Sequence, residues 1–92
     1  MSEYIEITTK PTDDPDVMFF YTNLRLDEGE PESYDSLAAM EEGSPVAQAL
    51  ALVAGIAQLY IDGQELTITR EPGVEWYFIA ADVSAILKDF FL

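Results

Sequence analysis

The chain has 92 residues, 49% of them hydrophobic, and carries 18 acidic against 4 basic side chains, which gives a formal net charge of −14. This composition predicts one folded domain over residues 1–92, because disorder requires low hydrophobicity in addition to high charge. Nucleic acid and anionic membranes are poor partners for such a chain, since binding to their phosphates depends on Lys and Arg.

Cysteine and histidine are both absent from the sequence. Disulfides, Cys/His zinc sites, thiolate-held metal clusters and the nucleophile–base pairs of Ser–His and Cys–His enzymes are therefore excluded. No signal-peptide pattern is found, and the longest mostly apolar run, residues 46–61, is too short to span a bilayer. We expect a cytoplasmic protein that is not an enzyme and binds no cofactor.

The start of the chain predicts two strands joined by a turn. Residues 4–9 alternate in character and place Ile5 and Ile7 on one face of a strand. Two prolines and three aspartates in residues 11–16 are typical of a turn. Residues 17–23 are apolar and aromatic, and we expect a second strand there that pairs with the first as an antiparallel hairpin.

The acidic stretch at residues 27–42 leaves two local structures open. Its first part, residues 27–32, is too charged to be buried. Residues 33–36 could form a short edge strand around Tyr34. Alternatively, Ser36 could cap a helical turn through the apolar residues that follow it.

Two helices are predicted in the remainder of the chain. Ser44 can cap the first helix and Pro45 fits its first turn, where a missing N–H costs nothing, while Gly55 ends it. The second helix starts within residues 72–76 and runs to residues 89–91. Its predicted core stripe consists of Trp76, Ile79, Val83, Ile86 and Phe90, with Leu87 beside it.

A β-hairpin is predicted between these helices, with strands at residues 56–61 and 65–70 joined at Asp62-Gly63. Alternation along its first strand places Ile56, Gln58 and Tyr60 on one face and Ala57, Leu59 and Ile61 on the other. The predicted fold is an α+β two-layer sandwich in the order β-β-α-β-β-α, with a four-stranded antiparallel sheet and both helices packed on one face.

Several short pieces match a known family in order and spacing. They are a turn that holds Thr12, Asp14, Pro15 and Asp16, the helix start from Gly43 to Ala47, the strand start at Gly55-Ile56, the strand from Leu66 to Arg70, and Trp76 with the closing Asp89-Phe90-Phe91. Over residues 4–91 the chain resembles the N-terminal domain of the Nfu/NifU-related iron–sulfur scaffold proteins. Asp14 and Asp16 stand where that family has asparagines, which adds negative charge to the turn.

The resemblance implies a non-catalytic accessory domain that binds proteins and is associated with iron–sulfur cluster assembly. It also implies a stand-alone copy, without the C-terminal Cys-x-x-Cys module in which that family carries its redox chemistry. The expected partner is a protein, for example one of iron–sulfur assembly.

Candidate contact residues lie in the first half of the chain, where ten of the eighteen acids fall between residues 13 and 42. Phe19 and Tyr21 alternate with Met18 and Phe20, so one of the two pairs faces away from the helices. The predicted partner-binding residues are Phe19, Tyr21, Asp13, Asp14, Asp16, Asp27, Glu28, Glu30 and Glu32. Two simpler interpretations remain open: the acidic residues lie in solvated turns, and residues 27–42 cover the aromatic side chains.

A second hypothesis is a small regulatory domain that binds a metal ion or ligand through its acidic loops. An EF-hand starting at Asp14 is excluded, because Phe19 stands where the loop needs Gly and Arg25 where it needs Glu. No residue is therefore assigned to a metal, to a cofactor or to catalysis. Trp76 is interpreted as a core residue.

Overall fold

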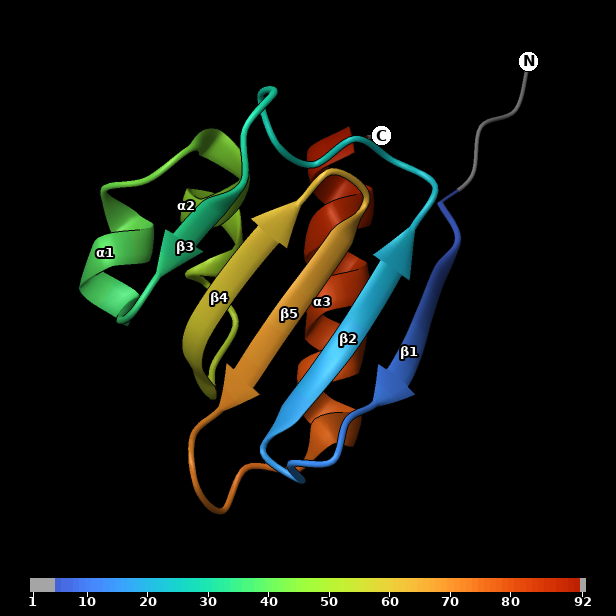
Figure 1. Cartoon of the computed structure of the whole chain (residues 1–92), viewed down its shortest axis with the longest axis vertical. Coiled ribbons are helices and arrows are strands. Elements are labelled where there is room, and N and C mark those ends of the chain that lie inside the picture. Colours follow the sequence, from blue (N-terminus) through green and yellow to red (C-terminus); the bar gives the residue numbers. More distant parts are fainter. Residues whose placement is uncertain (1–4, 92) are drawn as a thin grey trace.

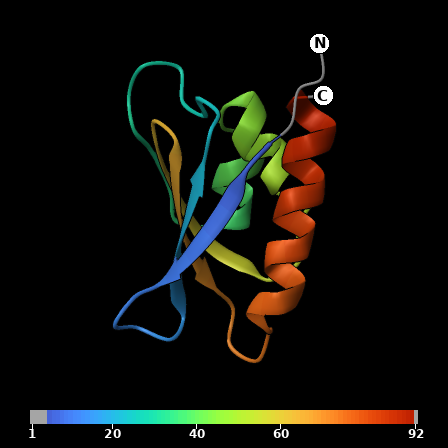
Figure 2. The same cartoon turned by 90° about the vertical axis from the view of Figure 1, so that its right-hand side faces the viewer.

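The computed structural model describes residues 5–91, which fold into one antiparallel sheet with helices on one of its faces (Figures 1 and 2). The elements of this part are β1 Ile7–Pro11, β2 Val17–Thr22, β3 Glu32–Tyr34, α1 Leu37–Glu41, α2 Pro45–Leu50, β4 Ile56–Asp62, β5 Glu65–Arg70 and α3 Trp76–Phe91. The strands lie in the order β1-β2-β5-β4-β3, so β5 is central and β1 and β3 are the edges.

The predicted α+β class is confirmed, but the predicted count and order of elements are wrong. Within residues 5–91 the order is β-β-β-α-α-β-β-α, with a five-stranded sheet and three helices. The difference arises because both structures considered for residues 27–42 form. β3 pairs with β4 up to Tyr34 opposite Leu59, and Ser36 then caps α1 by accepting a hydrogen bond from the Ala39 N–H (3.1 Å).

The N-terminal hairpin is confirmed with shifted bounds. β1 begins at Ile7 and continues to Pro11, which pairs with Met18, whereas the prediction began at Tyr4, outside the described residues. Pro11 is tolerated there because β1 is an edge strand. The turn after it is held by the side chain of Asp14, whose Oδ1 accepts a hydrogen bond from the Asp16 N–H (2.9 Å).

Helix α2 starts as predicted but ends at Leu50, well before Gly55. Gly55 has a φ of +98°, and a Cβ at this position would lie 2.6 Å from Cγ1 of Val74. This glycine therefore does not end the helix. It opens β4, where the chain passes close to the segment that leads into α3, and its carbonyl accepts a hydrogen bond from Glu71 (2.8 Å).

The predicted face of Ile56 is wrong, because the β4–β5 ladder is irregular at its start. Ile56 pairs with Arg70 and Gln58 with Thr69, so Ala57 is an extra residue between the two pairs. A bulge of this kind reverses the alternation, and Ile56 points into the core with 2% of its surface exposed. The rest of β4 follows the predicted pattern: Leu59 and Ile61 are buried, while Gln58 and Tyr60 are exposed.

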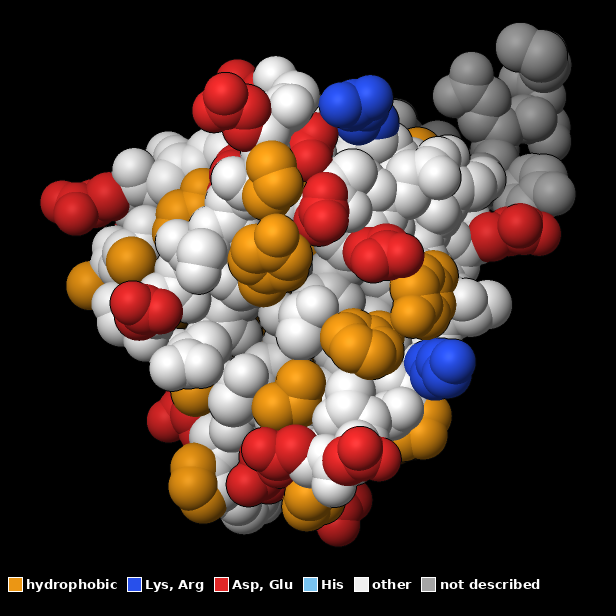
Figure 3. All heavy atoms as spheres, in the orientation of Figure 1, with side chains coloured by type: hydrophobic (Ala, Val, Ile, Leu, Met, Phe, Trp, Pro, Cys, Tyr) orange, Lys and Arg blue, Asp and Glu red, His pale blue; other side chains and the backbone are white. Residues whose placement is uncertain are grey.

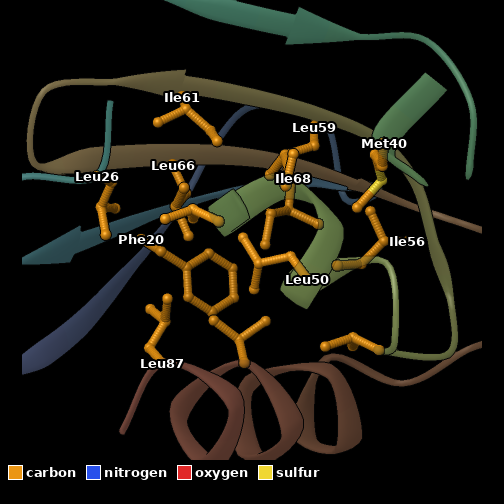
Figure 4. Packing of buried hydrophobic residues seen from close by; sticks show 14 of the residues in the cluster. Phe20, Leu26, Met40, Leu50, Ile56, Leu59, Ile61, Leu66, Ile68 and Leu87 are labelled. Atoms are coloured by element: carbon orange, nitrogen blue, oxygen red, sulfur yellow. The ribbon is translucent and has the colours of Figure 1, made fainter. Parts of the chain in front are cut away.

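The core lies between the sheet and α3, and Figure 4 shows the ring of Phe20 pointing from β2 toward Leu87 of α3. On α3 the buried residues are Ile79, Val83 and Leu87, and Phe91 packs against the core one turn later. Phe90, which was predicted on this stripe, is 43% exposed. The stripe follows an i, i+4 spacing through Leu87, and that spacing selects Phe91 over Phe90.

Trp76 lies at the first turn of α3 and is half-buried. Its ring centroid is 6.2 Å from that of Phe20, and its Nε1–H donates a hydrogen bond to the Pro15 carbonyl (2.9 Å). The Arg70 guanidinium lies over the indole at 5.5 Å and also donates to Asp16 Oδ1 (3.1 Å). These contacts fasten the β1–β2 turn to α3, so the tryptophan has a structural role.

Candidate functional site

The candidate site is the outer sheet face, defined as the surface formed by the outward side chains of β1, β2, β5 and β4 that no helix covers (Figure 3). Alternation along β2 sends Met18 and Phe20 inward and Phe19 and Tyr21 outward. Phe20 is fully buried, whereas Phe19 and Tyr21 are partly exposed, with ring centroids 6.2 Å apart. Two neighbouring aromatic rings therefore stand on an uncovered sheet surface.

Strand pairing places further side chains beside these rings. In one row across the sheet, Phe19 lies opposite Thr67 and Thr67 opposite Tyr60. In the adjacent row, Tyr21 lies opposite Glu65 and Glu65 opposite Asp62. Members of such pairs have Cβ atoms about 5 Å apart, so the aromatic and acidic side chains form one continuous surface.

Tyr60, Asp62 and Glu65 are not among the residues predicted for the site, although the sequence contained a signal for them. The two-residue loop Gly63-Gln64, one position later than the predicted Asp62-Gly63 turn, sets the register of the β4–β5 hairpin and places Glu65 opposite Asp62. What the sequence could not supply is the pairing of β2 with β5. Only this long-range contact brings Phe19 and Tyr21 next to the hairpin.

Asp27, one of the predicted contact residues, is instead part of the fold. It is 8% exposed, and its carboxylate accepts hydrogen bonds from the N–H groups of Gly63 (2.6 Å) and Gly29 (3.0 Å). The Arg25 Nε donates a longer bond (3.3 Å) to the same carboxylate. The bond from Gly63, followed by those from Gly29 and Arg25, lowers the pKa of Asp27. Asp27 is therefore not available to contact a partner.

The next acids along the chain border a groove: Glu28 and Glu30 are exposed, and Glu32, the first residue of β3, is half-buried. Glu28, Glu30 and Glu32 line an open groove of about 600 Å³ together with Gly29, Pro31, Tyr34 and Ser44. Tyr34 is fixed at its wall, because its hydroxyl donates to Glu32 Oε1 (2.5 Å) and accepts from the Ser44 N–H (3.1 Å). Figure 2 shows the loop that carries Glu28 and Glu30 bending away from the helices, toward the side of the outer sheet face.

The predicted contact residues do not form one cluster. The turn with Asp13, Asp14 and Asp16 lies at one end of β2. The acidic loop, residues 27–31, follows the other end (Figure 1). Asp14 accepts a hydrogen bond within the turn, and Asp16 forms an ion pair with Arg70, whereas Asp13 is exposed. Phe19 and Tyr21 lie between the two ends.

A second exposed aromatic pair lies on α3, away from the sheet. Tyr77 and Phe78 are 76% and 60% exposed, and their ring centroids are 5.4 Å apart.

Across residues 5–91, no three or more carboxylates are grouped so that they could hold a metal ion. No helix within the same range has the length and apolar character needed to cross a membrane.

The fold and the outer sheet face define a small two-layer α+β domain whose exposed sheet carries aromatic and acidic side chains. A family model described as "Scaffold protein Nfu/NifU N terminal" matches residues 7–92, and the chain belongs to this family. The resemblance inferred from the sequence is confirmed. Since the chain has no cysteine, it contains no Cys-x-x-Cys pair.

Similar proteins with assigned names are found in fruit flies. The protein named "NFU1 iron-sulfur cluster scaffold homolog, mitochondrial" from Drosophila ananassae is 31% identical over 86 residues, covering 92% of this chain and 30% of the relative. The protein of the same name from Drosophila willistoni is also 31% identical, over 92% of this chain and 29% of its own length. The chain thus spans about 30% of the length of these relatives.

Two solved structures share the fold. A NifU-like protein from Saccharomyces cerevisiae has a TM-score of 0.76 at 22% identity and covers 97% of this chain and 82% of its own. Protein SAV1430 from Staphylococcus aureus has a TM-score of 0.71 at 12% identity, with coverages of 89% and 98%. At these identities the likeness concerns the fold.

Proposed function

We propose that this chain is a non-catalytic accessory domain in iron–sulfur cluster assembly, and that it binds a protein partner through the outer sheet face. The observation that carries the proposal is the pair of outward rings, Phe19 and Tyr21, on a surface that no helix covers. Exposed aromatic side chains that lie together are typical of protein contact sites. The link to iron–sulfur clusters rests on the family and on the names of the fly relatives.

The edges of the sheet favour binding on its face over the addition of a partner strand. β1 carries Lys10 and ends in Pro11, and both residue types discourage pairing at an edge. β3 is three residues long, too short to support a long ladder. A partner therefore finds more accessible surface on the outer sheet face than along either edge.

Charge determines the kind of partner. A domain with a net charge of −14 repels acidic proteins and attracts basic ones, and this attraction accelerates the encounter. These 92 residues contain no cysteine thiolate that could hold a cluster. The accessory role is then to orient or recruit an iron–sulfur protein.

Capture from a native cell extract tests the proposal. We expect the immobilised domain to recover an iron–sulfur assembly or recipient protein, and the double variant Phe19→Ser/Tyr21→Ser to lose it. The double variant Tyr77→Ser/Phe78→Ser removes a more exposed aromatic pair from α3 and serves as the control, which should still recover the partner. Failure to recover any iron–sulfur protein, or loss only in the α3 variant, would contradict the proposal.

A further inference from the structure

The side chains around Thr67 and Glu65 indicate which chemical group of a partner the outer sheet face is suited to bind. This inference rests on the proposed function. Thr67 lies between Phe19 and Tyr60, and the backbones that carry these two rings are two strand spacings apart, roughly 10 Å. The central position holds a small side chain. Aromatic surface is therefore available on either side of the centre of the sheet.

The adjacent row places two carboxylates side by side. Glu65 lies directly opposite Asp62, and both are exposed. Like charges in this position are destabilising, because their Cβ atoms are only about 5 Å apart. Neither residue takes part in an ion pair among residues 5–91, where Arg25 pairs with Asp27 and Arg70 with Asp16. A cation supplied by a partner would relieve this repulsion.

The aromatic rings and carboxylates together favour arginine over lysine as the bound cation. An arginine guanidinium is flat, stacks on aromatic faces and binds a carboxylate through two parallel hydrogen bonds. A lysine ammonium is a strongly hydrated point charge that gains less from the same surface. Tyr21 borders Glu65 and Tyr60 borders Asp62 along its strand, so a guanidinium can reach a ring and a carboxylate at once.

We propose that the outer sheet face binds an arginine side chain of the partner protein, stacked on Tyr21 or Tyr60 and paired with Glu65 and Asp62. The arginine belongs to a protein, since the charge of the domain opposes nucleic acid and anionic lipid. Lys10 lies beside Phe19 on β1, at the far end of the row from Tyr60. Because Lys10 would repel another cation near β1, the arginine site lies on the β5–β4 side of the outer sheet face.

Titration followed by NMR tests this inference with three peptides of matched length: alternating arginine–glycine, lysine–glycine and citrulline–glycine. We expect shifts confined to Tyr21, Tyr60, Thr67 and their neighbours, and binding of the arginine peptide that is about two- to fivefold tighter than that of the lysine peptide. The neutral citrulline peptide should cause no saturable shift. Equal affinity for arginine and lysine, with shifts spread over all acidic segments, would overturn the inference.

Two variants locate the site. Glu65→Gln and Tyr60→Leu should each weaken binding of the arginine peptide, whereas Asp82→Asn, which removes an exposed charge from α3, should not. The dispersion of the amide spectrum reports whether each variant is folded. Binding that is unchanged in both sheet variants would place the arginine elsewhere and refute the inference.

The peptide experiment and the capture experiment fail independently. If the wild type and Glu65→Gln recover the same iron–sulfur protein equally well, the arginine inference is wrong and the proposed function stands. If the arginine peptide binds as expected but no iron–sulfur protein is captured, the proposed function is wrong and the arginine inference stands.

Discussion

The carboxylate of Asp27 accepts a hydrogen bond of 2.6 Å from the backbone N–H of Gly63, although the two residues lie 36 positions apart in the chain. Next to it, the Leu26 N–H donates to the Gly63 carbonyl (2.8 Å) and the Thr22 N–H to the Gln64 carbonyl (2.9 Å). These bonds join the segment after β2 to the tip of the β4–β5 hairpin. The acidic loop is thereby anchored at its base while Glu28 and Glu30 remain exposed.

Replacing Asp27 by Asn should loosen this anchor. The amide keeps the size of the carboxylate but weakens the charge-assisted bonds from Gly63 and Gly29. We expect a lower melting temperature and faster hydrogen exchange at the Gly63 amide. Glu28→Gln, at the exposed acid next to Asp27, is the control and should leave exchange at Gly63 unchanged. Equal exchange rates in the wild type and Asp27→Asn would show that the anchor contributes nothing.

The same anchor predicts a dependence of stability on pH. Because the pKa of Asp27 is lowered by folding, its contribution is complete above the unfolded value and is lost as the pH falls through the folded value. The difference in free energy of unfolding between wild type and Asp27→Asn should therefore be constant at neutral pH and shrink below about pH 4. Urea unfolding of both proteins from pH 7 to pH 3 measures this difference. A gap that widens toward low pH would contradict the assignment.

Gly55→Ala should be costly, since the alanine must adopt a φ of +98° and its Cβ would lie 2.6 Å from Val74 Cγ1. We expect a loss of about 1–3 kcal/mol in the free energy of unfolding. Gly63→Asn is the matched control, because Gly63 has a φ of +62° with open space around it and Asn tolerates that conformation. Equal destabilisation by the two changes would refute the close approach at Gly55.

Phe19 and Phe20 are adjacent in sequence but lie on opposite faces of the sheet, so their alanine variants should differ widely. Phe20→Ala removes a fully buried ring and should cost about 3–5 kcal/mol. Phe19→Ala removes a cross-strand pair on the exposed face and should cost about 0.2–1 kcal/mol. Denaturant titration of both variants tests the assignment of the faces. Similar losses would contradict the assignment.

Salt should stabilise the domain. With a net charge of −14, the folded state concentrates like charges that ions screen over a distance of about 10 Å at 0.1 M. We expect the melting temperature to rise when sodium chloride is added. The rise should be smaller in Glu28→Gln/Glu30→Gln, which removes two exposed charges from the acidic loop. An unchanged or falling melting temperature would show that charge repulsion is unimportant here.

Features with local causes could be predicted from the sequence. The start of α2 depends on Ser44 and Pro45, and the β4–β5 turn depends on Gly63, so neighbouring residues were sufficient to locate both. The alternation of β2 likewise predicted that one aromatic pair would face outward. The sheet determines which pair it is, because Met18 and Phe20 pack against the core.

Features with distant causes could not be predicted. Asp27 is buried because its partner, Gly63, comes from another part of the chain, and no local pattern distinguishes it from the exposed acid at Glu28. The bulge that turns Ile56 inward appears only when β4 is paired with β5. The outer sheet face depends in the same way on the pairing of β2 with β5, which joins the two halves of the chain.

The central position of β5 has a consequence for folding. β5 lies between β2 and β4, so the sheet stays in two separate parts until residues 65–70 are available. Until then, β2 presents an unpaired edge with the apolar sequence of residues 17–22. Long-range pairing of this kind slows folding, because loop closure must precede the contacts that reward it. While it is being synthesised, the domain is therefore most vulnerable to aggregation before its central strand is complete.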